Sequence, residues 1–294
     1  MLQPDINQEQ KLAFTCTQEA DHLPPLDPQA DIWFKQARAM QKASGPKDFA
    51  AIGALYRKAA QKDHYKAMIN LQNMLRSGLL APQPGRSAPQ MVLAITERLI
   101  TLNIPAGYYV MGTHLQTGYA VKRDQQAALA YFRKAADLGN PEGQNVVGNL
   151  FRSRVLIPEQ RPNPAYRPEI GKAMLACAAN QGNAEAAMNL AGYYAVAEKN
   201  YPMAVTYYQV AIKHGSELAP FILKECFSGP PPSDELKYLA LPNDPERVRR
   251  YGLIEKEIDQ NRLARFPDID KIVPLPPTPL PEWDGSFEYK IKTK

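Results

Sequence analysis

The amino-acid sequence predicts an all-α fold, an α-solenoid of about five helix-turn-helix repeats followed by an extended proline-rich strap. One segment pattern recurs at a period near 40 residues, and its turns stand 40, 36, 43 and 33 residues apart. Each copy has apolar residues at helical spacing. Many of the 27 prolines lie before Asp31 or after Gly229, so the ends differ from the middle. The predicted turn residues are Asp63, Asn103, Gly139, Gly182 and Gly215.

Composition and charge are ordinary for a folded protein. Of the 294 residues, 45% are hydrophobic and 22% are charged, which argues against disorder of the whole chain. The formal net charge is +5, and the middle of the chain, residues 49–240, carries 20 Lys and Arg against 13 Asp and Glu. This surplus is too spread out for a nucleic-acid stripe, so we expect no nucleic-acid partner and consider an acidic protein partner. No run of 18 apolar residues predicts a membrane span.

The beginning of the chain predicts an extended segment over residues 1–30. The next stretch, Asp31 to Ala43, reads DIWFKQARAMQKA and predicts an amphipathic helix that closes one end of the repeats. The repeats themselves are expected over residues 31–228.

The clearest repeat begins at Thr117 and reads TGYAVKRDQQAALAYFRKAADLGNPEG. Asp124 is expected to cap its first helix, Gly139 to end that helix in a left-handed conformation, and Asn140 and Pro141 to begin the second helix. The predicted buried positions are Ala127, Tyr131, Ala135, Leu138, Val147, Leu150 and Phe151. Gly143 and Gly148 are expected to let neighbouring backbones approach.

This stretch resembles the Sel-1-like repeat, a relative of the tetratricopeptide repeat, through its KAA and LG elements and its alanine and aromatic positions. The resemblance implies a right-handed α-solenoid. The usual GxGV element is written here Gly118-Tyr119-Ala120-Val121, with alanine for the second glycine. The match weakens in the first, second and fifth copies, the last of which has Ile212 in place of an alanine.

After the repeats, residues 229–260 are expected to form closing helices over Asp234 to Leu241 and Pro245 to Ile258. Residues 261–294 are expected to be a proline-rich extended tail, because IVPLPPTPLPEW lacks many backbone donors and cannot be helical. The apolar side of the tail is formed by Ile272, Leu275, Leu280 and Trp283. We expect the tail to lie as a strap along repeat surface; the alternative is a ligand for a proline-binding module.

The two ends also resemble a bacterial family of repeat proteins that closes with a similar proline-rich tail. The segments that carry this resemblance are Phe14–Asp31, Pro230–Tyr251 and Phe266–Gly285. Members of that family are commonly exported and lie beside secreted antibacterial toxins. The resemblance therefore implies an immunity protein of a type VI secretion system.

Motifs for chemistry are not found in the sequence. The four histidines form no HExxH signature, and Gly107 to Gly112 has the spacing of a phosphate loop without the lysine that would follow. Asp268 and Asp270 are paired acids that we expect to be solvated. The histidines are His22, His64, His114 and His214. We therefore expect no enzyme, no cofactor and no metal.

The cysteines and the start of the chain bear on the compartment. Cys16, Cys177 and Cys226 show no CxxC spacing, which leaves one disulfide with one thiol, or buried thiols. MLQPDINQEQ has no apolar core of a signal peptide. The chain is therefore cytoplasmic, or Met1 replaces a removed leader; the family resemblance favours the periplasm.

The function expected from these patterns is non-catalytic protein binding. We interpret the chain as an immunity protein that binds and neutralises a cognate type VI secretion toxin, with a phospholipase as first candidate. The alternative is a scaffold or regulator in a signalling or envelope complex. Because first helices usually line the concave side of such solenoids, we predict that Arg57, Arg133, Tyr208 and Lys213 bind the partner. We add Tyr109 and Tyr194 as aromatic anchors.

Overall fold

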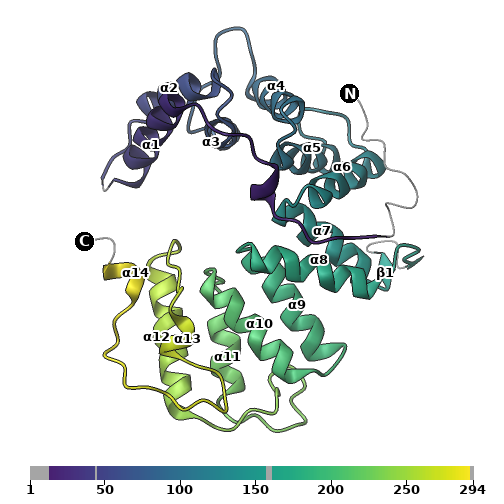
Figure 1. The fold of residues 1–294 in the computed structure, drawn as a ribbon, viewed down its shortest axis with the longest axis vertical. Coiled ribbons are helices and arrows are strands. Elements are labelled where there is room, and N and C mark those ends of the chain that lie inside the picture. Colours follow the sequence, from purple (N-terminus) through teal and green to yellow (C-terminus); the bar gives the residue numbers. More distant parts are fainter. Residues whose placement is uncertain (1–12, 44, 157–160, 292–294) are drawn as a thin grey trace. The chain divides into compact units, whose positions relative to one another are not determined.

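A computed structural model describes residues 13–43, 45–156 and 161–291 (Figure 1). The chain forms two compact units, unit 1 over Met1–Gln144 and unit 2 over Asn145–Lys294. The first twelve residues of the expected N-terminal segment, with Met1, lie outside the described residues.

Unit 1 is built of helices joined by tight turns within each repeat and by longer loops between repeats. Each helix packs against the next along the chain from α1 to α6. Its helices are η1 (Glu19–His22), α1 (Pro28–Lys42), α2 (Phe49–Ala60), α3 (Tyr65–Arg76), α4 (Ala88–Thr101), α5 (Pro105–Thr117) and α6 (Gln125–Asp137). The next helix, α7 (Pro141–Arg152), contains the boundary between the units. The helix expected over Asp31 to Ala43 is confirmed as α1.

Unit 2 continues with helix pairs and then changes character. A two-stranded antiparallel ribbon comes first, β1 (Val155–Leu156) pairing with β2 (Arg161–Pro162). The helices that follow are α8 (Pro168–Asn180), α9 (Ala184–Val196), α10 (Tyr201–Lys213), α11 (Ala219–Cys226), α12 (Pro245–Gln260), α13 (Ile269–Ile272) and α14 (Glu288–Ile291). The five expected helix-turn-helix repeats are thus α2–α3, α4–α5, α6–α7, α8–α9 and α10–α11, and the all-α class is confirmed.

Local signals explain where the helices begin and end. The backbone N–H of Ala127 donates to Asp124 Oδ1 at 2.9 Å, and that of Gly143 donates to Asn140 Oδ1 at 2.8 Å, as expected for caps of α6 and α7. Such a cap contributes about 1 kcal/mol. All five predicted turn residues have positive φ, including the non-glycines Asp63 (56°) and Asn103 (55°), because Asp and Asn tolerate this region.

The core follows the predicted stripes. In the clearest repeat, six of the seven predicted positions are buried, and Leu150 is half-buried. Gly143 and Gly148 are packing positions: a Cβ on Gly143 would lie 2.8 Å from Ala136 N, and one on Gly148 would lie 3.0 Å from Gly171 O. Burial of large side chains such as Tyr56 and Tyr251 stabilises each unit, by roughly 1.5–3 kcal/mol for each apolar side chain.

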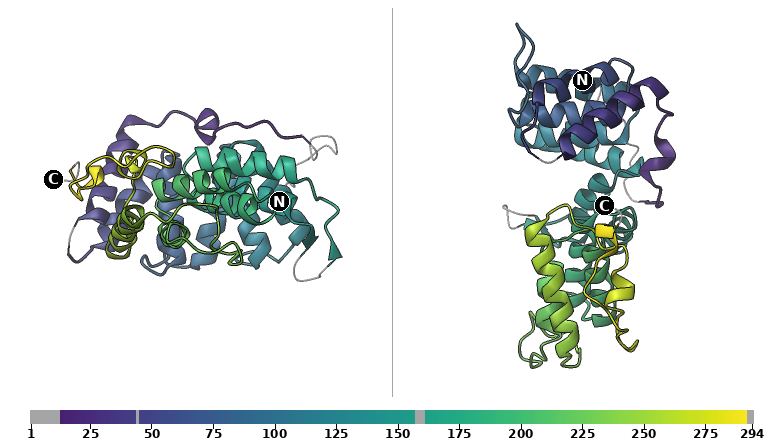
Figure 2. Two further views of the ribbon diagram at one scale, coloured as in Figure 1. Left: turned by 90° about the horizontal axis from the view of Figure 1, so that it is seen from below. Right: turned by 90° about the vertical axis from the view of Figure 1, so that its left-hand side faces the viewer.

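The N-terminal segment lies across the repeat turns of unit 1, and Figure 2 shows its extended path with η1 in the middle. Gln144 Nε2 donates to the carbonyl oxygen of Thr17 at 3.1 Å, and Asn140 Nδ2 donates to Glu19 Oε1 at 3.0 Å. Further along, Leu23 and Leu26 pack against a cluster that includes Ile104. The segment thus contacts the second and third repeats in turn.

The C-terminal tail is a strap on unit 2, as expected, and runs beside α12 in the right view of Figure 2. Gln209 Nε2 donates to the carbonyl oxygen of Val273 at 2.8 Å, and Gln209 Oε1 accepts from the hydroxyl of Tyr251 at 2.7 Å. Ile272 is buried, and the other predicted apolar residues of the tail pack against the same core: Leu275, Leu280 and Trp283. The tail is therefore bound through both its backbone and its apolar side chains.

Two expectations about the C-terminal region need correction. Residues 234–241, all of which the structure describes, form turns in place of the expected closing helix. Ala240 has a positive φ of 52°, and Pro242 follows, so helical hydrogen bonding does not propagate there. The tail is also not wholly extended, because it contains the short helices α13 and α14.

Cys16 and Cys177 are disulfide-bonded, and Cys226 is a free, buried thiol. Among the described residues, no helix has the length and apolar character that crossing a membrane requires.

Candidate functional site

The structure places the six predicted partner-binding residues in different surroundings, three in each unit. Arg57, Tyr109 and Arg133 belong to unit 1, whereas Tyr194, Tyr208 and Lys213 belong to unit 2. Each group is therefore described within its own unit.

Two of the six are buried and present little surface to a partner. Arg133 is 5% exposed: its Nε donates to Asp137 at 2.9 Å, and its Nη2 donates to the carbonyl oxygen of Ala13. Tyr208 is 8% exposed in the core of unit 2. Ala13, which covers Arg133, is distant from it in the sequence, so helical spacing does not report this burial.

Tyr109 and Lys213 are half-buried and already engaged. The ring of Tyr109 lies 5.7 Å from that of Phe132, centroid to centroid. Lys213 Nζ is 3.8 Å from Asp270 Oδ2, and the carbonyl oxygen of Lys213 accepts from the N–H of Phe266. Lys213 therefore contacts the segment that leads into the tail strap.

Tyr194 belongs to an aromatic and cationic cluster on unit 2. Its ring stacks on Tyr207 at 5.8 Å, and Lys172 Nζ lies 5.9 Å from its centroid. Lys172 also pairs with Glu198 at 2.6 Å and with Glu169 at 3.0 Å. Burial lowers the pKa of Lys172, but these hydrogen bonds outweigh it and raise the pKa overall. The cation is thus held over the tyrosine rings in its charged form.

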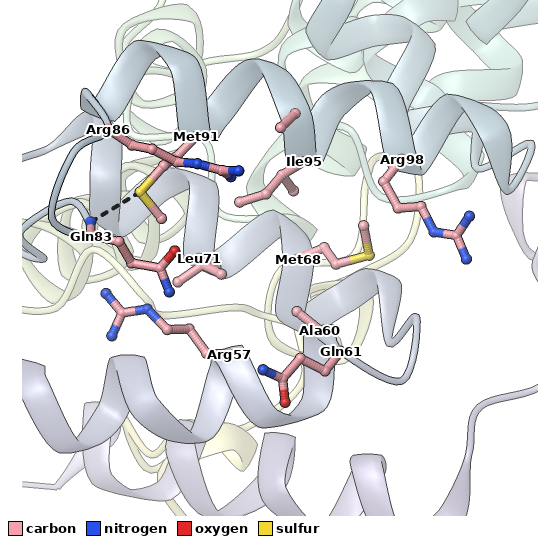
Figure 3. Close-up of a pocket in the computed structure, with 11 residues that line it drawn as sticks. Arg57, Ala60, Gln61, Met68, Leu71, Gln83, Arg86, Met91, Ile95 and Arg98 are labelled. Atoms are coloured by element: carbon pink, nitrogen blue, oxygen red, sulfur yellow. Dashed lines mark hydrogen bonds between the residues drawn. The ribbon is translucent and has the colours of Figure 1, made fainter.

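Arg57 lines a pocket of about 270 Å³ between α2, α3 and α4 of unit 1 (Figure 3). The floor of the pocket is apolar: Ala60, Met68, Leu71, Met91, Ala94 and Ile95. Its polar lining consists of three arginines and two glutamines: Arg57, Arg86, Arg98, Gln61 and Gln83. We call this site the arginine pocket.

The arginines stand at two ends of the arginine pocket. Figure 3 shows Arg57 and Arg86 at the end beside Gln83, and Arg98 at the opposite end. Arg98 is tied to Asp63 through Nε at 2.9 Å and Nη2 at 2.6 Å. The hydrogen bonds to Asp63 raise the pKa of Arg98, so this side chain is charged throughout the physiological range.

Arg57 and Arg86 are less fully paired than Arg98. Arg57 Nη2 donates to the carbonyl oxygen of Ala81 at 3.3 Å, whereas its buried Nε has no hydrogen-bond partner. Arg86 is exposed. Since none of the eleven lining residues is acidic, the pocket combines positive charge with an apolar floor, which suits a ligand that has a carboxylate beside an apolar group.

The other residues considered for chemistry have structural contacts. His64 Nδ1 accepts from the N–H of Ala67 at the start of α3, and Asp270 Oδ1 accepts from Gln209 Nε2 at 3.0 Å. Asp268 is expected to be solvated, but it is 9% exposed, because the chain end folds over it and the N–H of Glu288 donates to its Oδ2. In the described part of the chain, no three His, Cys, Asp or Glu side chains are grouped so that they could hold a metal ion.

Comparison with known proteins places the chain in a family. A family model for a domain of unknown function, DUF6396, matches residues 219–294, and no curated protein matches the chain. The solved structure of immunity protein Pa5087 from Pseudomonas aeruginosa is 37% identical, with a TM-score of 0.68, and the alignment covers 91% of this chain and 96% of that one. Immunity protein PA5088 from the same organism is 32% identical, with a TM-score of 0.72 and coverage of 90% and 95%.

A more distant structure agrees on the fold. The Sel1 repeat protein from Oxalobacter formigenes is 19% identical, with a TM-score of 0.59, and covers 79% of this chain and 90% of its own. This match shows the Sel1-like fold alone. The structures that are 37% and 32% identical, each aligned over at least nine-tenths of this chain, establish that the chain belongs to the bacterial Sel1-like repeat family that contains Pa5087 and PA5088.

Proposed function

We propose that this protein is an immunity protein that binds and neutralises a cognate antibacterial toxin delivered by a type VI secretion system. The observation that carries the proposal is the similarity to Pa5087 and PA5088, both named immunity proteins, over nine-tenths or more of each chain. The two alignments leave only about a tenth of this chain uncovered.

Physical features of the chain support this role. Neutralising a toxin requires that its active site or its entry route be covered, and it requires no catalytic residue on the inhibitor. Both described ends are bound against repeats by glutamine side chains that donate to their backbone carbonyl oxygens, so the surfaces between them are formed before a partner arrives. A preformed surface loses less conformational entropy on binding.

We further propose that the protein acts in the periplasm and that its target is a phospholipase. The disulfide-bonded state of Cys16 and Cys177 supports an oxidising compartment. A toxin that acts from that compartment meets lipid and cell wall, and a lipid-degrading enzyme is the first candidate.

Co-expression tests this function. The secreted toxin encoded beside the gene is exported to the periplasm of a susceptible bacterium, with or without this protein, and survival and co-purification are measured. Survival together with a stable complex supports the proposal. Death of the co-expressing cells with no complex contradicts the immunity role, and a complex with envelope proteins alone favours a scaffold.

A further inference from the structure

We propose that the arginine pocket of unit 1 is a docking site for a partner-protein segment in which an apolar side chain is flanked by carboxylates. The inference rests on the proposed function in one respect, namely that the partner is the toxin. The occupant follows from three properties of the pocket: its charge, its floor and its rigidity.

The positive charge of the arginine pocket favours a carboxylate as the bound group. Arg57 and Arg86 lie at one end and Arg98 at the other, with no acidic residue in the lining. Arg98 is paired with Asp63 through Nε and Nη2, so a carboxylate at that end would meet its Nη1 group. A guanidinium presents its N–H groups as a fork that matches a carboxylate, and arginine is enriched among residues that dominate binding energy. Because the Nε of Arg57 is buried, a carboxylate from a partner would contact this guanidinium through its Nη groups, beside the exposed Arg86.

The apolar floor of the arginine pocket favours an apolar side chain of the partner between the two carboxylates. Met68, Leu71 and Ile95 lie between the two arginine ends in Figure 3. The volume of about 270 Å³ is just below the roughly 300–1,000 Å³ of small-molecule pockets, which suits one inserted side chain. Methionine adapts its shape to an inserted group.

The same apolar floor makes nucleic acid an unsuitable ligand for the arginine pocket. A phosphate backbone is bound by clustered or aligned cations along its path, together with donors to successive phosphates. Here an apolar surface separates the arginine ends, and it would be left uncovered by a phosphate chain. A protein segment satisfies both parts of the lining.

The pocket is formed before binding. The loop between α3 and α4 is anchored by Leu80, which is 6% exposed and packs so closely on Gly53 that a Cβ there would lie 2.6 Å from Leu80 Cδ1. The same loop contacts α4 through Gln83, whose N–H lies 3.2 Å from Met91 Sδ. Because the loop is fixed on both sides, little ordering cost falls on the binding step.

A peptide titration tests the pocket without the toxin. The full chain is labelled with ¹³C at its methionine methyl groups, and the Met68 and Met91 signals are assigned with Met68→Leu and Met91→Leu. The probe is acetyl-Gly-Glu-Leu-Glu-Gly-amide, and the matched probes are the same peptide with glutamine for glutamate and a short oligothymidylate. We expect both methyl signals to shift with the glutamate peptide alone. No shift with that peptide, or an equal shift with a matched probe, overturns the inference.

A second measurement uses the toxin encoded beside the gene. The triple variant Arg57→Gln, Arg86→Gln, Arg98→Gln should bind the toxin roughly 30-fold or more weakly than the unmodified chain. The control triple, Lys42→Gln, Lys122→Gln, Arg123→Gln, removes the same charge from exposed positions of unit 1 outside the pocket and should change affinity by less than about threefold.

The two failures can be told apart. If the unmodified chain does not bind the toxin, the proposed function fails, and the peptide titration alone decides whether the pocket binds acidic segments. If the unmodified chain binds and both triples bind equally well, the toxin does not dock in the arginine pocket, and the inference is wrong while the function stands.

Discussion

Arg250 Nη1 donates a hydrogen bond to the carbonyl oxygen of Ile272 at 2.6 Å, which joins the last long helix to the start of the proline-rich strap. Its Nη2 donates to the carbonyl oxygen of Pro281 at 2.7 Å, so one guanidinium holds the strap at two points nine residues apart. Arg247 acts in the same way on Pro274 and Thr278. Carbonyl groups of a proline-rich segment have few backbone partners, and these arginines supply the missing donors.

The first prediction is that Arg250→Met destabilises the strap. The Arg250 side chain is 5% exposed, and its loss leaves the buried carbonyl oxygen of Ile272 without this donor, which costs about 1–3 kcal/mol. Trp283 on the strap reports its release by fluorescence during urea unfolding, in a Trp33→Phe background that removes the other tryptophan.

Arg249→Met is the matched control. Arg249 pairs with the same carboxylate, Glu246, but its side chain is 52% exposed. We expect the free energy of unfolding to change far less than for Arg250→Met, since exposed ion pairs contribute little. Equal effects of the two variants would show that the contacts of Arg250 with the strap carry no stability.

The second prediction concerns the N-terminal segment at the third repeat turn. A Cβ added at Gly139 would lie 2.4 Å from the backbone carbon of Gln18, so Gly139→Ala must displace the segment or the turn. Gly118→Ala places alanine in the same left-handed conformation, because φ is 79° at Gly118 and 83° at Gly139. The atom nearest to a Cβ at Gly118, however, would be 3.6 Å away. We expect about 1 kcal/mol of destabilisation for Gly118→Ala and clearly more for Gly139→Ala.

Hydrogen exchange in residues 13–27 separates these effects. Gly139→Ala should speed exchange there, whereas Gly118→Ala should leave that segment as protected as in the unmodified chain. Unchanged protection in both variants would mean that Gly139 does not hold the N-terminal segment in place.

The repeats could be predicted from the sequence because their causes are local. Asp124, Gly139 and Asn140 determine where helices start and stop within a few residues, and the apolar stripe follows from the helical period. Such signals need no knowledge of the remaining chain.

The candidate site could not be predicted in this way, because it depends on distant segments. Arg57 and Arg133 each stand six residues before a repeat turn, yet Arg57 lines an open pocket and Arg133 is covered by Ala13. Arg86 enters the pocket from a loop whose position depends on Leu80 and Gly53. No spacing in the sequence reports these contacts.

The third prediction is a loss of stability in mild acid caused by His114. Burial lowers the pKa of His114 to about 4, and the positive charge of Arg76 acts in the same direction. In the unfolded chain the pKa is about 6.5, so the unfolded state binds more protons between these values. Stability is therefore fully present above about pH 6.5 and falls as the pH drops toward 4, by up to about 3 kcal/mol from this group.

Urea unfolding at pH 7 and pH 5 measures this loss. His114→Gln should reduce the difference in the free energy of unfolding between the two pH values. NMR titration of the His114 ring in the folded chain gives a direct check: the imidazole should remain neutral at pH 5. A titration midpoint near 6.5 would contradict the assignment.

The last prediction is that Cys226 is chemically silent in the folded protein. Burial raises the pKa of this thiol to about 12, and the nearby carboxylates of Glu225 and Asp234 act in the same direction. Because the thiolate is the reactive form, alkylation at pH 8 should be slow both from lack of access and from lack of ionisation.

Cys16 and Cys177 are disulfide-bonded, so they also resist alkylation until they are reduced. Iodoacetamide followed by mass spectrometry should therefore find no adduct on the native chain, one after urea, and three after urea with reductant. Two adducts on the native chain would contradict the disulfide, whereas a single fast adduct at Cys226 would show that the core of unit 2 opens near α11.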